Sequence, residues 1–477
     1  MDIKRLSFQD PDGFVFRAYG KIYRAVLKTY SFDFERIKKS TLWNSDWFVK
    51  HIETEPEQLD RDILGWIYTQ IDKEKLLTVF ELEKIEFITY PWEWTPTMLR
   101  LAAEFTLSLQ STLVKEGFTL KDASFYNIQF VGGQPVFIDL LSVKAVDGNI
   151  YPWFAYGQFL MHFAFPLTLI RYGRFNTLSF LQAYPQGISK AEVSKHLKFS
   201  SYFSAFELLN IHLFKQVNDD TDVKSLAKQK KPDNKQTQQL TQLIDFAKRY
   251  IKTLGKHSLN STGRWINYYQ KDTSAFYGEE KERVFISFLD QIGKVEKAVD
   301  LGANTGAYSK LLLQYTSNLL SVEEDVECCE ILYKNIYDNK QTDCHWQLAC
   351  NNLLHPSPGI GWLNAERLPI FQRLRSPLVV ALAIIHHIYF SGSIELAQIA
   401  EMFNTVTTKY LIAEFVDKDD DKVILLAEKN KTRLSAYSRD NFIEAMNRNF
   451  IVQSAYDSSV TRHMFLFIKK TNESANS

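Results

Sequence analysis

Two closely spaced glycines follow a short apolar run in the C-terminal half of the chain. Residues 297–309 read KAVDLGANTGAYS. Gly302 and Gly306 allow the backbone to turn tightly and to approach a ligand closely. The apolar residues before them suit a buried parallel strand, and residues 308–315 continue with helical spacing. The pattern predicts a strand, turn and helix that bind a cofactor where the strand ends, because open α/β sheets bind ligands at that edge.

The spacing of these glycines differs from the Gly-x-Gly-x-x-Gly fingerprint, whose glycines accept a pyrophosphate, so the cofactor need not carry phosphate. Residues 318–322 read as a second strand that ends in three acids, Glu323, Glu324 and Asp325. A carboxylate there can accept hydrogen bonds from ribose hydroxyls. The three acids are also compatible with a solvated helix start, which the helix dipole stabilises. We assign the ligand role to Glu323 and the capping role to Glu324.

A pair of histidines follows a third apolar run. Residues 378–385 come after Pro377 and are typical of a buried central strand, and His386 and His387 stand at its carboxyl end. Either imidazole is a candidate general base for an oxygen or nitrogen nucleophile, because the ordinary pKa of histidine, about 6.5, lies near working pH. The alternative is that one histidine only orders the loop by bonding the backbone. Some group transfers need no base, because alignment of the reactants supplies much of the rate.

Four segments together resemble class I methyltransferases: VDLGANTG at 299–306, SVEED at 321–325, HPSPGIGW at 355–362 and ALAIIHH at 381–387. More narrowly, they resemble a bacterial group of nodulation-type methyltransferases that carry an extra N-terminal region. The resemblance implies S-adenosylmethionine as cofactor and a small-molecule or glycan acceptor. It places around the methionine part of the cofactor the residues Asp300, Gly302, Asn304 and Gly306. It places Glu323 on the ribose and Asn352 beside the adenine, where an Asp is the expected residue.

The remaining C-terminal strands complete the same domain. Residues 410–415 read as a further strand, and residues 450–454 and 463–468 as a terminal strand pair, with which such folds close. We therefore predict an α/β Rossmann-like methyltransferase domain over residues 243–470 and a frayed tail over 471–477. Residues 216–242 are rich in Lys, Asp, Gln, Asn and Thr, and they predict a polar linker or flexible loop. A helix that begins near Leu240 is expected to lead from it into the methyltransferase domain.

The N-terminal region, residues 1–215, contains a second pattern that suits chemistry. Residues 120–130 read LKDASFYNIQF, and PVFIDL follows at 135–140 after two glycines that predict a hairpin. Asp122, Asn127 and Asp139 have the order and spacing of a kinase catalytic core. In phosphotransferases the first Asp orients the acceptor hydroxyl, and the Asn and second Asp bind magnesium. The segment thus resembles the lower lobe of kinases and predicts an α+β, kinase-like domain.

This N-terminal pattern departs from that of active kinases. Leu120 stands where His is common, and Leu140 and Leu141 replace the usual Phe-Gly. Residues 10–16 with 22–23 predict a hairpin, but only Gly13 and Gly20 are available for a phosphate loop, and no phosphate-binding lysine is assignable. An active phosphotransferase, a kinase-like fold that has lost catalysis or binds another ligand, and a coincidental hairpin all remain open.

Two tryptophans precede a helix that we predict from Met98 to Lys115. The segment PWEWTP at residues 91–96 predicts exposed aromatic side chains at a domain edge. Trp92 and Trp94 are therefore candidates for stacking against a sugar. The alternative is ordinary packing.

Composition indicates a globular protein without bulk attraction to polyanions. The chain has 477 residues, 45% hydrophobic and 23% charged, with a formal net charge of zero, so we expect neither a nucleic-acid partner nor a membrane surface. The apolar window 153–170 is interrupted by Gln158, His162 and Pro166, which predicts a buried helix and no transmembrane segment. We also expect no signal peptide and a cytoplasmic location. The four cysteines indicate a reducing compartment, and their spacing predicts no metal site.

These patterns favour an S-adenosylmethionine-dependent methyltransferase whose N-terminal domain recognises the acceptor. The acceptor is predicted to offer a hydroxyl, amine or carboxyl group, on a glycan or a secondary metabolite by family analogy. The alternative is a kinase-like nucleotide-binding or phosphotransfer protein whose methyltransferase domain only senses cofactor. The sequence predicts no oligomeric state.

Overall fold

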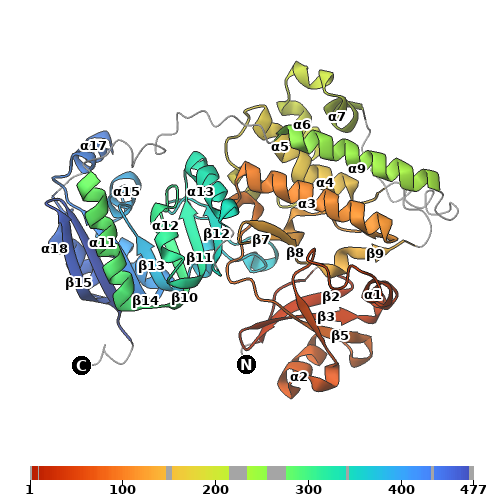
Figure 1. Cartoon of the computed structure of the whole chain (residues 1–477), viewed down its shortest axis with the longest axis horizontal. Coiled ribbons are helices and arrows are strands. Elements are labelled where there is room, and N and C mark those ends of the chain that lie inside the picture. The colour runs from red at the N-terminus through yellow and green to blue at the C-terminus, as the bar shows by residue number, and fades with distance from the viewer. Residues whose placement is uncertain are drawn as a thin grey trace.

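The computed structural model describes residues 3–8, 10–146, 153–213, 234–254, 275–339, 343–430 and 435–471. The two halves of the chain lie side by side, with residues up to 254 in one lobe and residues from 275 in the other (Figure 1). We call these lobes the N-terminal domain and the C-terminal domain.

A mostly parallel sheet forms the centre of the C-terminal domain. Its strands are β10 (Val295–Leu301), β11 (Thr316–Glu323), β12 (His345–Cys350), β13 (Ser376–Ala381), β14 (Thr407–Val416), β15 (Phe450–Ser459) and β16 (Arg462–Lys469). The order across the sheet is β12-β11-β10-β13-β14-β16-β15, with β10 to β14 parallel and β16 antiparallel to both of its neighbours. The strand order reverses beside β10, as in Rossmann-type sheets. The predicted Rossmann-like α/β fold is confirmed, including the terminal strand pair.

Helices cover this sheet: α11 (Ala275–Ile292), α12 (Ala307–Leu312), α13 (Val326–Asp338), α14 (Ile370–Arg373), α15 (Ile385–Gly392), α16 (Leu396–Val406), α17 (Asp421–Asn430) and α18 (Arg439–Met446). Along β10, Ala298 faces one apolar cluster, and Val299 and Leu301 face another. Burial on both faces explains the continuous apolar runs of the parallel strands. The strand predicted over 378–385 ends at Ala381, because Ala383 adopts a left-handed φ of 53° and α15 then begins at Ile385.

The N-terminal domain begins with an antiparallel sheet. Its order is β1 (Ile3–Arg5), β2 (Gly13–Ala18), β3 (Lys21–Leu27), β5 (Leu76–Leu82) and β4 (His51–Thr54). Helices α1 (Ser31–Lys38) and α2 (Arg61–Gln70) lie on the connections. The predicted hairpin is the pair β2–β3, with Tyr19 and Gly20 at its turn in left-handed conformations.

Helices and two short strand pairs follow this sheet. Helix α3 (Pro96–Lys115) leads to β6 (Phe118–Leu120), which pairs with β9 (Val143–Ala145), and between them β7 (Ile128–Val131) and β8 (Gln134–Phe137) form the predicted hairpin. Later come α4 (Tyr156–Phe159), a π-helical turn (Leu160–Ala164), α5 (Phe165–Arg171), α6 (Lys190–His196), a 3-10 helix η9 (Phe199–Phe203), α7 (Ala205–Glu207), a π-helical turn (Leu208–Leu213) and α9 (Asn234–Leu254). Sheet followed by helices confirms the α+β prediction.

Two local predictions differ from the structure. Trp92 and Trp94 are each only 1% exposed, so the expectation of exposed aromatic side chains is wrong and packing explains them. Residues 234–242, predicted as linker, form the first turns of α9. This helix packs against α3 and α5 of the N-terminal domain, because its apolar stripe of Leu240, Ile244, Ala247 and Ile251 is buried there. Residues 216–233 of the predicted linker and 472–477 of the predicted tail lie outside the described residues.

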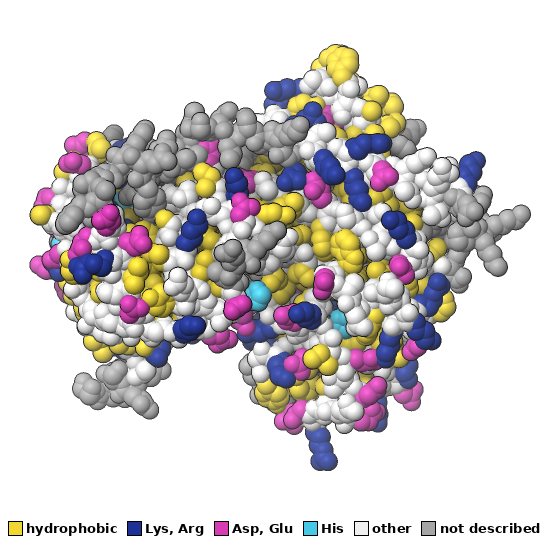
Figure 2. Space-filling view, in the orientation of Figure 1, with side chains coloured by type: hydrophobic (Ala, Val, Ile, Leu, Met, Phe, Trp, Pro, Cys, Tyr) yellow, Lys and Arg dark blue, Asp and Glu magenta, His cyan; other side chains and the backbone are white. Residues whose placement is uncertain are grey.

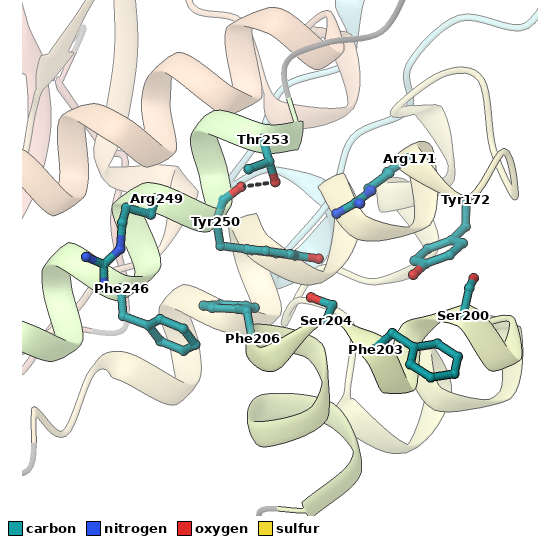
Figure 3. A pocket seen from close by; sticks show the side chains of 10 residues that line it. All are labelled: Arg171, Tyr172, Ser200, Phe203, Ser204, Phe206, Phe246, Arg249, Tyr250 and Thr253. Atoms are coloured by element: carbon teal, nitrogen blue, oxygen red, sulfur yellow. Dashed lines mark hydrogen bonds between the residues drawn. The ribbon is translucent and has the colours of Figure 1, made fainter.

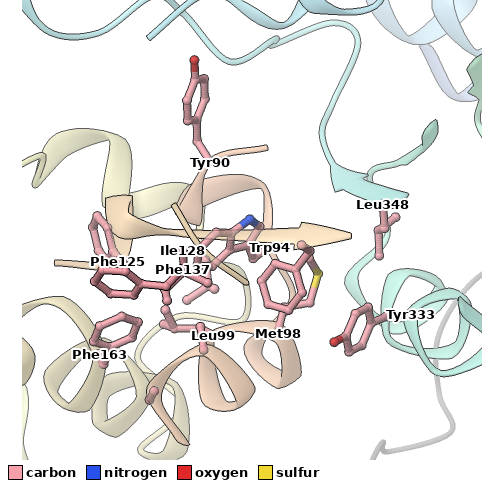
Figure 4. Packing of buried hydrophobic residues seen from close by; sticks show 14 of the residues in the cluster. Tyr90, Trp94, Met98, Leu99, Phe125, Ile128, Phe137, Phe163, Tyr333 and Leu348 are labelled. Atoms are coloured by element: carbon pink, nitrogen blue, oxygen red, sulfur yellow. The ribbon is translucent and has the colours of Figure 1, made fainter. Parts of the chain in front are cut away.

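The two domains share one apolar core. Tyr333 and Leu348 from the C-terminal domain pack in the same cluster as Trp94, Met98 and other residues of the N-terminal domain (Figure 4). The Tyr333 hydroxyl donates to the carbonyl of Gly133 at 2.7 Å, which ties α13 to the β7–β8 hairpin. A shared core of this kind favours a fixed relative position of the two domains.

Within the described parts of the chain, no helix is long and apolar enough to span a membrane. The apolar window 153–170 is mostly buried around α4 and α5, as expected. On the face shown in Figure 2, Lys and Arg side chains are interspersed with Asp and Glu, which agrees with the formal net charge of zero.

Candidate functional site

The glycine-containing turn after β10 requires left-handed backbone at three positions. Gly302, Asn304 and Gly306 have φ angles of 73°, 51° and 87°. A Cβ on Gly302 would lie 2.8 Å from Ile384 Cδ1, and one on Gly306 would lie 2.4 Å from Leu332 Cδ1. Glycine therefore satisfies both the conformation and the packing, and Asn is the side chain that tolerates this region best. The turn brings the start of α12 to the edge where the parallel strands end.

Asp300, the last acid of β10, lies beneath this turn. Its carboxylate is 3% exposed and accepts a hydrogen bond from the Ser309 hydroxyl at 2.6 Å. Ser309 also pairs with Ser321 at 2.8 Å, and the Trp346 indole donates to Ser321 at 2.8 Å. Burial raises the pKa of Asp300 to about 6, although Ser309 and the charge of Lys281 lower it in part. Asp300 thus joins α12 to the sheet from inside.

Glu323 ends β11 and lies beside the turn. One carboxylate oxygen accepts the backbone N–H of Asn304 at 2.8 Å, and the other accepts those of Glu324 and Asp325, each at 2.9 Å. Burial raises the pKa of Glu323, and these amide donors lower it in part. Because a carboxylate has about four acceptor positions, room for one further donor remains. The cap of α13 is Asp325, which accepts the N–H groups of Glu327 and Cys328, and not the predicted Glu324, which is exposed.

Two asparagines follow β12, and the structure gives them different surroundings. The Asn352 side-chain oxygen accepts the backbone N–H groups of Leu354 and His355 at 2.7 and 3.1 Å, so it stabilises a local turn. Asn351 is 7% exposed, and its backbone N–H donates to the Glu323 carbonyl at 2.8 Å. Its side-chain oxygen has no hydrogen-bond partner among the described residues. An acceptor of this kind is available beside Glu323.

The two histidines lie in the first turn of α15, directly after β13. His386 is 1% exposed, and neither of its ring nitrogens has a hydrogen-bond partner in the described part of the chain. Burial lowers the pKa of His386 well below its ordinary value, and the neighbouring His387, Arg462 and Lys281 lower it further. His387 is half-buried, and its ring lies 4.2 Å from that of His386, centroid to centroid. His386 is therefore neutral and enclosed, and His387 is the more accessible of the two.

The structure brings these predicted residues to one edge of the sheet. β10 pairs in parallel with β11 on one side and β13 on the other, so the glycine turn lies between Glu323 and the segment that leads to the histidines. The Asn304–Glu323 hydrogen bond and the close approach of Ile384 to Gly302 join the three strand ends. Asp300 lies below this surface, and Asn352 in the turn beyond it.

A buried ionic cluster beside this edge was not predicted from the sequence. Lys281 of α11 and Glu414 of β14, with side chains 6% and 0% exposed, form an ion pair at 2.7 Å. Lys281 Nζ also lies 5.0 Å from the centroid of the Tyr308 ring. Arg462 pairs with Asp420 at 3.2 Å. The one available signal was the acid within the apolar strand 410–415, because a buried acid requires a partner.

In the N-terminal domain, the three residues of the kinase-like pattern meet around Ser142. The Asn127 side-chain nitrogen donates to the Asp122 carbonyl at 3.3 Å and to the Ser142 hydroxyl at 3.1 Å. The Ser142 hydroxyl donates to Asp139 at 2.5 Å. The pKa of Asp122 is raised by burial. The β6–β9 and β7–β8 pairs hold the two segments together.

Arg24 is the residue of this cluster that the sequence did not reveal. It extends from β3, its side chain is 8% exposed, and it forms an ion pair with Asp139. Asp10 lies 3.9 Å from the same guanidinium nitrogen. Both Asp139 oxygens thus have partners, Arg24 on one and Ser142 on the other. Within the described ranges, no group of three or more His, Cys, Asp and Glu side chains is arranged to hold a metal ion.

Comparisons with known proteins give one long sequence relative. No family model matches the chain. The nodulation protein NoeA of Rhizobium meliloti (strain 1021) is 27% identical over 477 residues, which cover 98% of this chain and 94% of that protein.

Solved structures of lower similarity include several methyltransferases. The N-methyltransferase NodS from Bradyrhizobium japonicum WM9, in complex with S-adenosyl-L-homocysteine, has a TM-score of 0.32 and 9% identity, covering 44% of this chain and 96% of NodS. The magnesium protoporphyrin IX methyltransferase from Synechocystis PCC 6803 has a TM-score of 0.32 and 12% identity, covering 46% of this chain and 93% of that protein. The bifunctional kinase-methyltransferase WbdD has a TM-score of 0.29 and 13% identity, covering 40% of this chain and 39% of WbdD. These scores are low, so the fold assignment rests on the strand order described above.

Proposed function

We propose that the C-terminal domain is a methyltransferase that uses S-adenosylmethionine. The observation that carries this proposal is the Glu323 carboxylate, which ends β11 and accepts the Asn304 amide of the glycine turn after β10 at 2.8 Å. A turn and a carboxylate on neighbouring parallel strands form the arrangement that holds an adenosine at the edge of an α/β sheet. The resemblance of residues 299–306 and 381–387 to class I methyltransferases supports the same function.

The residues present fit this cofactor. Glu323 retains acceptor capacity for a ribose hydroxyl, and the backbone of Gly302, Asn304 and Gly306 forms the turn next to it. We assign the adenine contact to Asn351 in place of Asn352. The reason is that the Asn351 oxygen is buried without a partner among the described residues, whereas two backbone amides already occupy that of Asn352.

The bound cofactor supplies an activated methyl group, and the protein positions the acceptor. Of the two predicted bases, we favour His387, because it is half-buried, whereas His386 is enclosed and does not reach an acceptor. An imidazole at this position can accept a proton from a hydroxyl or amine acceptor. The proposed acceptor offers a hydroxyl, amine or carboxyl group on a small molecule or glycan.

Cofactor binding is tested by calorimetric titration of the full chain with S-adenosylmethionine. Glu323→Gln and Glu323→Ala are expected to raise the dissociation constant about tenfold or more, because a hydrogen bond to a charged group contributes about 1.5 to 3 kcal/mol. Glu324→Ala is the matched control, since it removes the adjacent, exposed acid. Equal affinity of all three variants would overturn the proposed site, and absence of binding by the wild type would overturn the function. Thermal unfolding of each variant verifies that it is folded.

Nucleotide binding by the N-terminal domain, with or without phosphotransfer, is a second candidate function, because Asp122, Asn127 and Asp139 of the kinase-like pattern meet around Ser142. Arg24 of β3 is then the cation for phosphates. The positive charge of Arg24 on Asp139 opposes a magnesium ion at this carboxylate, so the arrangement favours nucleotide binding without phosphoryl transfer.

This second candidate is tested with ATP in the presence of magnesium and in the presence of a chelator. Binding that survives chelation and is lost in Arg24→Ala supports a metal-independent nucleotide site. Magnesium-dependent binding that is lost in Asp139→Asn supports a phosphotransferase. Absence of ATP binding under both conditions excludes both functions and leaves the domain as a scaffold.

A further inference from the structure

A cavity of 620 Å³ opens in the N-terminal domain among α5, η9, α7 and α9 (Figure 3). It is lined by Arg171, Tyr172, Ser200, Phe203, Ser204, Phe206, Phe246, Arg249, Tyr250 and Thr253. None of these residues belongs to the glycine-turn site or to the kinase-like cluster. The volume lies within the range of about 300 to 1,000 Å³ that is typical of small-molecule sites.

A buried carboxylate organises the wall of this cavity. Glu207 is 0% exposed and accepts hydrogen bonds from the hydroxyls of Tyr172 and Tyr250 at 2.6 and 2.8 Å. The Arg171 guanidinium donates to it at 3.4 Å. Tyr250 also shares a hydrogen bond with Thr168 at 2.7 Å. Each of these side chains is thereby held in one position, which lowers the entropy that a ligand must remove on binding.

The charge of the cavity wall is positive. The Glu207 carboxylate is balanced by Arg171, whose side chain is still 42% exposed, so its remaining N–H groups are accessible. Arg249 is exposed, and no carboxylate or carbonyl pairs with it among the residues that the structure describes. Guanidinium groups bind carboxylates and phosphates through paired hydrogen bonds. Arg249 therefore provides an exposed anion-binding group, and Arg171 provides one that Glu207 holds in place.

The same cavity offers flat apolar surfaces. The rings of Phe206 and Tyr250 stack with centroids 3.9 Å apart and an interplanar angle of 8°. In Figure 3, Arg171 and Arg249 lie on either side of this stack, with Phe246 next to Arg249. Phe203 is 81% exposed, although it lines the cavity. Uncovered aromatic side chains beside a cavity are a common feature of ligand sites.

We propose that this cavity binds a small organic anion, a ring-bearing carboxylate or phosphate. Its acid group contacts Arg249, and its ring packs against Phe246, which lies on the same side of the Phe206–Tyr250 stack. The proposal is independent of the methyltransferase function, because the cavity shares no residue with that site.

The test uses the full chain and the fluorescent aromatic anion 8-anilino-1-naphthalenesulfonate as reporter. We expect saturable binding to one site and displacement by phenyl phosphate or benzoate, with the stronger competitor identifying the preferred acid group. Benzyl alcohol, which has the ring without the charge, is expected to compete at least about tenfold more weakly. Equal competition by benzyl alcohol would overturn the anionic character of the site.

Substitutions in the cavity lining test whether the fluorescent reporter binds at this cavity. Arg249→Gln is expected to raise its dissociation constant about tenfold, since one charge-assisted contact is lost. Lys252→Gln is the matched control, because it removes one positive charge from an exposed position of the same helix outside the cavity lining. Phe246→Leu keeps apolar volume at this half-buried position but removes the flat ring, so it is expected to weaken binding as well. Equal effects of Arg249→Gln and Lys252→Gln, or unchanged affinity of Phe246→Leu, would overturn the proposal.

Discussion

Arg373 and Glu93 form an ion pair that is buried between the two domains. Their side chains are 6% and 0% exposed, and one of their two hydrogen bonds, from Arg373 Nη1 to Glu93 Oε2, measures 3.0 Å. The same nitrogen donates to the Ile88 carbonyl at 2.7 Å. The pair links α14 of the C-terminal domain to the segment that precedes α3.

We predict that Arg373→Met destabilises the protein by about 3 to 5 kcal/mol, because it leaves a buried carboxylate without its partner. Replacing both residues by Met is expected to cost less than Arg373→Met alone. Arg100→Met is the control, since it removes one partner of the more accessible Arg100–Glu104 pair within α3, and it should cost at most about 1 kcal/mol. Urea midpoints measure these differences, and similar values for the two single variants would contradict the prediction.

Asp300 should make stability fall as pH rises. Its folded-state pKa of about 6 lies above the ordinary value of 3.8, so the folded protein holds a proton that the unfolded chain releases. The stabilisation is complete below pH 3.8 and is lost as pH rises toward 6; its size is of the order of 3 kcal/mol, at about 1.4 kcal/mol for each pKa unit. Asp300→Asn has no ionisable group at this position and therefore lacks this pH-dependent stabilisation. The stability difference between wild type and Asp300→Asn should therefore change across this window in urea titrations, and parallel curves would refute it.

Gly306→Ala should destabilise the C-terminal domain by about 2 kcal/mol or more, because the φ of 87° is strained for alanine and the new Cβ meets Leu332 Cδ1 at 2.4 Å. Gly278→Ala is the opposite case. Gly278 lies in α11 with no heavy atom within 4 Å of an added Cβ, so alanine should stabilise by about 0.5 to 1 kcal/mol. Thermal unfolding distinguishes the two, and a stabilised Gly306→Ala variant would contradict the described turn.

His386 should remain neutral well below pH 6.5, because burial and nearby positive charge oppose its protonation. Nitrogen-15 NMR of the histidine rings should show one imidazole whose shifts stay those of the neutral form at pH 5.5, and this signal should vanish in His386→Gln. Because its folded pKa is lowered, the stability contributed by the neutral ring is present above pH 6.5 and is lost as pH falls below it. A His386 ring that titrates near 6.5 would show that the site is open to solvent.

The sequence alone determined the local elements and several site positions. Strand-forming runs with turn glycines predicted the parallel sheet, the glycine turn and the β7–β8 hairpin, because hydrophobic periodicity and left-handed turns depend on neighbouring residues. The kinase-like pattern of Asp122, Asn127 and Asp139 was likewise visible in the sequence, because the three residues lie in one short segment. The roles of the predicted cofactor-binding and catalytic residues stay predictions.

The tertiary structure decided the partners and the covered surfaces. Arg24 of β3 reaches Asp139 from a distant part of the chain, and Lys281 of helix α11 reaches Glu414 of strand β14, so no local pattern reveals which residues pair. Burial of Trp92 and Trp94 and the packing of α9 against α3 depend on which surfaces meet when the chain folds. The physical reason is that ion pairing and burial are set by long-range contacts, whereas helix, strand and turn preferences are set largely by local sequence.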